Sequence, residues 1–459
     1  MRSKRLRVVA VLVLLGMVAC GISVAPLGAG SESAQLASPR PDLVLQWNEI
    51  AVNAGVDAGA GPVPQVRFVA ITQLAVFEAV NTIAGKYEPY LGTFVAPEGA
   101  SAEAAAVAAA HKVLITHFGS NARIAPTLDA SYATSMAGIP EGKPKVDGTA
   151  LGEAVAQAVI DLRANDGSSP AKTKAPGPAV PGEYQATSSC PIGPSGAREG
   201  SFFHWKDVTP FVIATPADFL LGPPPVLGSH RYTWDYLEVL TVGGAGSTQR
   251  PQNRSDVVRL YAAAGPAHLM NSTARQLALA ARGSLAENAR TLALMNMAMA
   301  DGFVASFLNK YTYNFWRPET AIHAGESDGN PRTPGDPSFA TFITTPCYPS
   351  YPSNFGTEVN TGTGILRRIY GERHHDIVLS FPAVPEVTVK YTRLRQLSTD
   401  VADARVYGGI HFRFDQVAGR HLGKLISRAA YRAALRPVHG QGEPDGDDDD
   451  DDGARSGDD

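Results

Sequence analysis

The sequence predicts an all-α fold, a large bundle of helices, and three observations support this. Apolar residues recur at three- and four-residue spacing over segments of about twenty residues, several of these segments end at glycine, and alternating strand patterns are scarce. The composition, 44% hydrophobic and 18% charged over 459 residues, is that of a globular protein with enough length for one large domain.

Four segments carry the helical pattern most clearly. Residues 66–85, 100–119 and 148–167 have apolar residues at helical spacing and end in glycine. Residues 287–311 are apolar nearly all round, which is expected of a helix buried at the centre of a large bundle. The best strand candidate, residues 384–391, is short.

The start of the chain has the layout of a secretory signal. Residues 1–30 run from a basic start through a short apolar stretch to small residues, with the expected cleavage near Ala29. This predicts a secreted or periplasmic protein. Cys20 loosely resembles a lipoprotein cleavage site, but Met17 fits that pattern poorly, so a lipid anchor is the less favoured interpretation.

One helical domain is expected over residues 40–435, followed by an acidic tail, residues 436–459, that is too polar to bury a core and is expected to be disordered. Two stretches rich in Gly and Pro, residues 165–200 and 220–228, predict long surface loops inside the domain. No basic block interleaved with aromatic residues occurs, which argues against a nucleic-acid partner. No membrane span is expected after the signal.

Two cysteines, Cys190 and Cys347, remain once the signal is removed. In an oxidising compartment they can form one disulfide, or they can be two separate buried thiols. The sequence leaves both interpretations open.

Three segments in the C-terminal half concentrate polar residues in apolar surroundings. The first is KYTYNFWRP, in which Lys310 and Arg317 are seven residues apart and can project from one face of a helix. The second is YPSYPSNFG, in which Ser353 is expected near a helix cap whose free N–H groups would face an anion.

The third segment is ARVYGGIHFRFD. Arg405 and His411 are six residues apart and off-phase on a continuous helix, but the intervening pair Gly408-Gly409 can break the helix and turn both inward. Asp415 follows His411 by four residues, a spacing that suits an imidazole oriented by a carboxylate. Together the three segments predict a site for a multiply charged oxyanion. The guanidinium groups of the arginines would bond its oxygens, and the lone pair of the histidine would reach its central atom.

The order and spacing of these motifs resemble the signature of the vanadium-dependent haloperoxidase and type 2 phosphatidic acid phosphatase superfamily. The words NFWRPETAIH, PSYPS and GGIHFRFDQVAG are similar to the secreted bacterial haloperoxidase branch, and the likeness extends over roughly residues 40–430. The resemblance implies a helical bundle that binds vanadate, with phosphate as a competing oxyanion.

The resemblance also implies a role for each motif residue. The implied ligands of the vanadate oxygens are Lys310, Arg317, Ser353, the backbone N–H of Asn354, and Arg405. His411 would be the metal ligand, or the nucleophile of a phosphatase, and Asp415 would support it. The implied catalytic set is Lys310, Arg317, Ser353, Arg405, His411 and Asp415.

The second motif departs from the family pattern. The family has P-S-G-H where this chain has Pro352-Ser353-Asn354-Phe355, and the missing histidine is the family's acid–base residue. A positioned acid or base contributes ~10²–10⁴ in rate. The other histidines that could substitute for it are His323, His374 and His375, each of which is more often a surface residue.

Three functions from different classes remain open. The first, and the leading hypothesis, is an oxidoreductase that uses vanadate and hydrogen peroxide to oxidise a halide or a small organic acceptor. The second is a metal-free acid phosphatase acting through His411. The third is a non-catalytic oxyanion-binding protein, in which Phe355 marks the loss of the acid–base residue. The sequence fixes neither the halide nor the oligomeric state.

Overall fold

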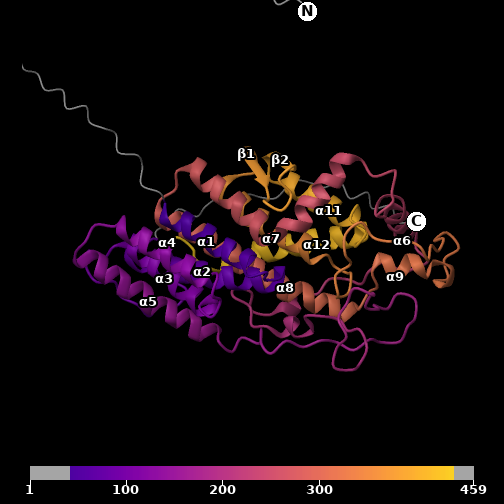
Figure 1. The fold of residues 1–459 in the computed structure, drawn as a ribbon, viewed down its shortest axis with the longest axis horizontal. Helices are drawn as coiled ribbons and strands as arrows, with labels where there is room; N and C mark the ends of the chain where they lie inside the picture. Colours follow the sequence, from indigo (N-terminus) through magenta and orange to yellow (C-terminus); the bar gives the residue numbers. More distant parts are fainter. Residues whose placement is uncertain (1–41, 439–459) are drawn as a thin grey trace, which may run out of the picture. The chain divides into compact units, whose positions relative to one another are not determined.

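A computed structural model describes residues 42–438 of the chain. It confirms the all-α prediction: the described residues form twelve α-helices and one two-stranded sheet (Figure 1). The described residues belong to one compact unit. The predicted signal peptide, the Cys20 site and all but the first residues of the predicted acidic tail lie outside the described residues, so those predictions stand as made, as does the predicted extent of the domain.

The helices fall into two groups along the chain. The first group is α1 (Leu43–Asp57), α2 (Pro62–Ala84), α3 (Ala102–Phe118), α4 (Ala125–Ala137) and α5 (Lys143–Arg163). The second group is α6 (His230–Val242), α7 (Gln252–Ala281), α8 (Leu285–Tyr313), α9 (Pro318–His323), α10 (Asn354–Tyr370), α11 (Arg395–Val406) and α12 (Arg413–Ala433). Three short 3₁₀ helices lie at Phe203–Asp207, Pro216–Phe219 and Gly325–Ser327.

The four segments with a clear helical pattern all form helices, which become α2, α3, α5 and α8. Helix α2 ends at Gly85, which adopts the left-handed conformation (φ 62°) that glycine reaches at no steric cost. Helix α3 begins at Ser101, whose side chain accepts a hydrogen bond from the Ala104 amide, and ends at Gly119.

Helix α8 is the central element of the fold, as its apolar sequence predicted. It packs against α2, α10 and α12, and a capping box formed by Ser284 and Glu287 begins it. Helices α2 and α8 are in fact long and apolar enough to cross a membrane, contrary to expectation. However, 83% and 94% of their apolar windows are buried inside the protein, as in core helices.

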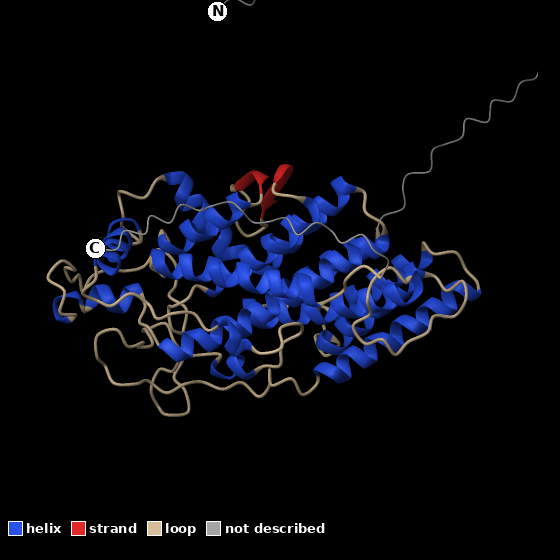
Figure 2. Ribbon diagram, turned by 180° about the vertical axis from the view of Figure 1, so that it is seen from behind, coloured by secondary structure: helices blue, strands red, loops and turns tan. Residues whose placement is uncertain are grey.

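The sheet is an antiparallel hairpin at the edge of the helices (Figure 2). Its second strand, β2 (Thr388–Arg393), overlaps the predicted strand at residues 384–391. Its first strand, β1 (Arg373–Ser380), was not predicted, because it opens with four polar residues and only its second half alternates. Ile377 pairs with Tyr391, and both side chains are buried.

The long connection between α5 and α6, which contains both loop-rich stretches, is held to the rest of the protein at defined points. A disulfide joins Cys190 to Cys347, which decides between the two interpretations of these cysteines. The buried carboxylate of Asp301 in α8 accepts backbone hydrogen bonds from residues 211, 212 and 213 at 2.5, 2.7 and 2.9 Å. The long excursion is therefore fastened both to α8 and to the segment that precedes α10.

Helices α10 and α12 approach each other closely because α12 presents glycines at the contact. A Cβ added at Gly419 would lie 2.5 Å from the Ser353 carbonyl oxygen, and one at Gly423 would lie 2.6 Å from that of Thr357. This close approach places the start of α12 beside the start of α10. The two chain segments that carry the second and third motifs meet there.

We predict that Gly423→Ala destabilises the protein by about 1–3 kcal/mol, because the new methyl group overpacks the contact between α10 and α12. Urea denaturation of the oxidised protein measures the change. The matched control is Gly177→Ala, since a Cβ at Gly177 meets nothing within 4 Å. Equal stability of the two variants would contradict the close approach of α10 and α12.

Candidate oxyanion site

The structure brings the three predicted motifs together in the interior. Lys310, Arg317 and His411 are fully buried, and Arg405 is 9% exposed. Lys310 lies near the end of α8, Arg317 is the residue before α9, Arg405 lies near the end of α11, and His411 precedes α12.

Lys310 and Arg317 do not share one helix, contrary to expectation. Helix α8 ends at Tyr313 because Asn314 adopts a left-handed conformation (φ 45°), and α9 starts afresh at Pro318. Both side chains nevertheless reach the same target, the segment formed by residues 348–352. The turn between α8 and α9 therefore brings the two side chains together, although they were expected to meet on one face of a single helix.

The predicted helix break at Gly408-Gly409 is confirmed. Helix α11 ends at Val406, and Gly409 adopts a left-handed conformation (φ 82°) in which an added Cβ would lie 2.3 Å from the Gly243 carbonyl oxygen. The break turns His411 back into the interior at the start of α12.

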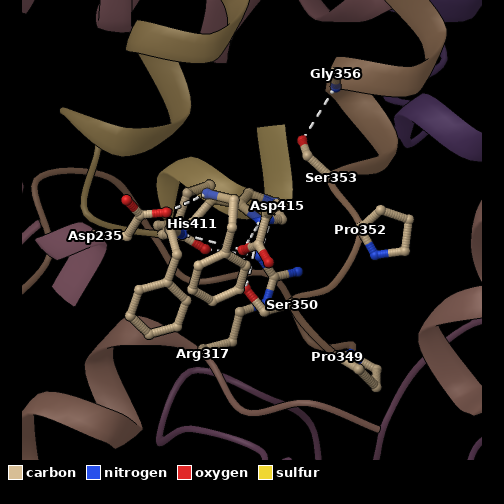
Figure 3. Close-up of polar contacts among 12 residues, drawn as sticks. Asp235, Arg317, Pro349, Ser350, Pro352, Ser353, Gly356, His411 and Asp415 are labelled. Carbon is tan, nitrogen blue, oxygen red and sulfur yellow. Dashed lines mark hydrogen bonds and ion pairs between the residues drawn. The ribbon is translucent and has the colours of Figure 1, made fainter. Parts of the chain in front are cut away.

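His411 and Asp415 form the expected pair (Figure 3). His411 Nδ1 lies 2.8 Å from Asp415 Oδ2, and Arg317 Nη1 lies 3.0 Å from His411 Nε2. Because a guanidinium only donates, Nε2 must carry the lone pair and Nδ1 the proton, which it donates to Asp415. This tautomer is the one that presents a ligand nitrogen at Nε2.

Ser350 is a member of the site that the sequence analysis missed (Figure 3). Its hydroxyl donates to Asp415 Oδ2 at 2.6 Å, and the same oxygen accepts the Phe412 amide at 3.0 Å. Burial raises the pKa of Asp415 to about 7, while the Ser350 hydrogen bond and the charge of Lys310 oppose that rise. The only signal in the sequence was the place of Ser350 within the word YPSYPS, between two recognised motif residues.

The pKa of His411 lies well below its ordinary value. Burial is the largest cause, followed by the positive charges of Arg317, Lys310 and Arg405. The imidazole is therefore neutral at physiological pH and keeps its lone pair available.

Lys310 is fully engaged by the protein itself. Its Nζ donates to the carbonyl oxygens of Pro349, Ser350 and Pro352 at 2.8, 2.9 and 2.6 Å, which uses all three protons of the ammonium group. Burial, and next the charge of Arg317, lower the pKa of Lys310 well below its usual range. In this arrangement Lys310 holds the 348–352 segment in place and adds positive charge, but no donor remains for an external ligand.

The two arginines retain free donors. Arg317 Nε donates to the Tyr348 carbonyl and Nη1 to that of Ile410, both at 2.8 Å, while Nη2 is buried with no partner among the described residues. The Arg405 guanidinium lies 5.1 Å from the centre of the Phe355 ring, and its buried Nε has no partner within the described structure. Burial lowers the pKa of Arg405 to about 10, so it remains charged at neutral pH.

Ser353 caps α10, as predicted, with its Oγ accepting from the Gly356 amide at 3.1 Å (Figure 3). The hydroxyl proton of Ser353 and the backbone N–H groups of Asn354 and Phe355 have no acceptor among the described residues. These donors, together with Arg317 Nη2 and Arg405 Nε, are the set that an oxyanion requires. The residues present therefore fit vanadate or phosphate, with Lys310 as the exception.

Phe355 is 7% exposed and packs between the Arg405 guanidinium and the ring of Tyr261. None of the three alternative histidines hydrogen-bonds to a site residue in the described part of the chain. His323 is exposed and bonds to the Phe339 carbonyl, while His374 and His375 lie on β1. None of these three histidines is therefore placed to replace the missing acid–base residue.

Comparisons with known proteins agree with this fold. Residues 290–440, which contain all three motifs, match the family model of the VCPO second helical-bundle domain. The chain is similar to the first bacterial vanadium-dependent iodoperoxidase of known structure, with a TM-score of 0.72 and 22% identity over 87% of this chain and 98% of that one. It is also similar to a holo-type bacterial vanadium-dependent chloroperoxidase, with a TM-score of 0.65 and 13% identity over 81% and 91%. None of the curated proteins matches the chain in sequence.

We predict that the His411 imidazole remains neutral down to pH values well below its ordinary pKa of about 6.5. Because its pKa is lower in the folded than in the unfolded state, His411 supports folding above about pH 6.5 and opposes it progressively as the pH falls. A ¹⁵N NMR titration of the imidazole measures this, with the denatured protein as the reference. A doubly protonated His411 at pH 7 would contradict the described environment.

Proposed function

We propose that this chain, a member of the vanadium haloperoxidase superfamily, is a vanadate-dependent oxidoreductase of the haloperoxidase type, with turnover limited by Phe355. One observation carries the proposal. Two buried arginines with unpartnered donors surround a neutral histidine, and within the described part of the chain Asp415 is the carboxyl group that faces Arg317. Such an excess of buried positive charge is costly unless an anion offsets it.

Arg317 and Arg405 would hold the oxygens of vanadate, together with the Ser353 hydroxyl and the Asn354 amide. His411 Nε2 would ligate the metal after the Arg317 guanidinium yields its contact with that nitrogen. Bound vanadate would act as a Lewis acid toward hydrogen peroxide, and the peroxide would be the oxidant of the halide. Bound phosphate would occupy the same donors because it shares the shape and charge of vanadate.

The residues of the chain would prepare this site in separate ways. Asp415 accepts the Nδ1 proton of His411 and fixes the ring, and Ser350 fixes Asp415 in turn. Lys310 holds the 348–352 segment, whose Tyr348 carbonyl positions Arg317. None of these side chains is placed to move a proton at the position of Phe355, which explains the expected limit on turnover.

A non-catalytic oxyanion-binding protein is the second candidate, and the packing of Phe355 favours it. The Phe355 ring lies against Arg405, so the position that carries the acid–base group in the family is apolar in this chain. A metal-free phosphatase acting through His411 would suffer from the same missing acid. The Cys190–Cys347 disulfide supports export to a secreted or periplasmic location.

We predict that vanadate and phosphate compete for one site and that Arg405→Ala abolishes the binding of both. Isothermal titration of the purified protein with each anion, alone and in the presence of the other, measures this. Arg395→Ala, on the exposed side of the same helix α11, is the matched control and should bind normally. Independent binding of the two anions, or unchanged affinity in a folded Arg405→Ala variant, would overturn the site.

We predict weak or absent bromination by the wild-type protein with vanadate and peroxide, and a gain in Phe355→His on the order of 10²–10⁴. The double variant Asn354→Gly/Phe355→His guards against misplacement of the new imidazole by the Asn354 side chain. Halide-dependent dye bromination, with and without vanadate, is the assay. Robust wild-type bromination that collapses in His323→Ala would locate the acid elsewhere and refute this account of Phe355.

A further inference from the structure

A cavity of about 330 Å³ opens beside the candidate oxyanion site. Its floor includes Phe355 and Arg405, and its walls come from the turn between α1 and α2, from α7, and from Phe303 of α8. Its size lies at the lower end of small-molecule sites, so a ligand of roughly one ring fits it.

The wall formed by α7 depends on a break in that helix. Gly265 is non-helical (φ 69°, ψ 169°), and Pro266 follows it. Proline has no backbone N–H, so Pro266 adds no unsatisfied donor to the cavity wall at the break. Ala262, Ala263 and Ala264 line the cavity on the preceding turn, which makes this wall both smooth and apolar.

Four aromatic rings line the rest of the cavity, those of Phe303, Tyr348, Phe355 and Phe381, together with the polar residues Gln65 and Asn354. Aromatic rings favour a flat, apolar guest in edge-to-face or offset-stacked contact. Arg405 is the one formally charged side chain in the lining, no carboxylate lines the cavity, and the Arg405 guanidinium has no hydrogen bond among the described residues. The cavity therefore combines aromatic walls with one buried cation that has no hydrogen-bond acceptor among the described residues.

We infer that this cavity is a binding site for a small aromatic carboxylate, whose ring lies among the aromatic side chains and whose carboxylate meets Arg405. A planar carboxylate matches the two parallel donors of a guanidinium, and it would supply the hydrogen-bond acceptor that Arg405 lacks among the described residues. A neutral aromatic molecule would leave Arg405 unsatisfied. The inference goes beyond the proposed function: it shares Arg405 with the oxyanion site but requires neither vanadium nor turnover.

Isothermal titration of the full chain with benzoate tests this inference, with benzamide and acetate as matched probes. Benzamide keeps the shape without the charge, and acetate keeps the charge without the ring. We expect benzoate to bind about tenfold or more tightly than either probe. Benzamide loses the charge-assisted hydrogen bond to Arg405, and acetate loses the ring contacts. No benzoate binding at millimolar concentration, or equal affinity for benzamide, would overturn the inference.

A cavity-filling variant separates this site from the oxyanion site. Ala263→Phe fills the cavity from its exposed rim and should abolish benzoate binding. Vanadate should still bind, because Arg317, Ser353 and His411 lie outside the cavity lining. Ala280→Phe, on the exposed end of the same helix α7, is the control and should bind benzoate normally. Benzoate binding that survives in Ala263→Phe refutes the aromatic carboxylate site. A wild type that binds benzoate but not vanadate refutes the proposed function alone.

Discussion

Positive charge buried beside the Asp415 carboxyl is the constraint on which this structure depends. Lys310, Arg317 and Arg405 all lose water on folding, and within the described part of the chain the Asp415 carboxyl is the acidic group that faces Lys310 and Arg317. Such charges persist in an interior only where hydrogen bonds or a bound ion compensate for the lost solvation. The protein compensates for Lys310 entirely with backbone carbonyls and for Arg317 in part, and it leaves the Arg405 guanidinium against an aromatic ring. The uncompensated remainder points to an anion.

Much of this arrangement follows from the sequence because it rests on local rules. The apolar periodicity of α2, α3, α5 and α8, the capping by Ser353, the break at Gly408-Gly409 and the His411–Asp415 spacing each depend on residues close together in the chain. Local chemistry of this kind is visible without knowledge of the fold.

Other features depend on contacts between distant segments and could not be predicted. Lys310 was expected to bind the ligand, but its three donors meet a segment about forty residues later in the chain. Ser350 joins the site only because the close contact of α10 with α12 places it beside Asp415. Strand β1 was missed because its sequence carries a weak pattern and needs β2 as its partner.

In the proposed function, anion binding and proton transfer depend on different residues of this chain. The donors of Arg317 and of the start of α10 are positioned by contacts other than the Phe355 ring, whereas the Arg405 guanidinium lies against that ring. A crystal structure of the protein with vanadate most directly tests the account. We expect anomalous density for vanadium bonded to His411 Nε2, with its oxygens on Arg317, Arg405 and the Asn354 amide. Density elsewhere, or none at a saturating concentration, would contradict the claim that the buried charge exists to hold an oxyanion.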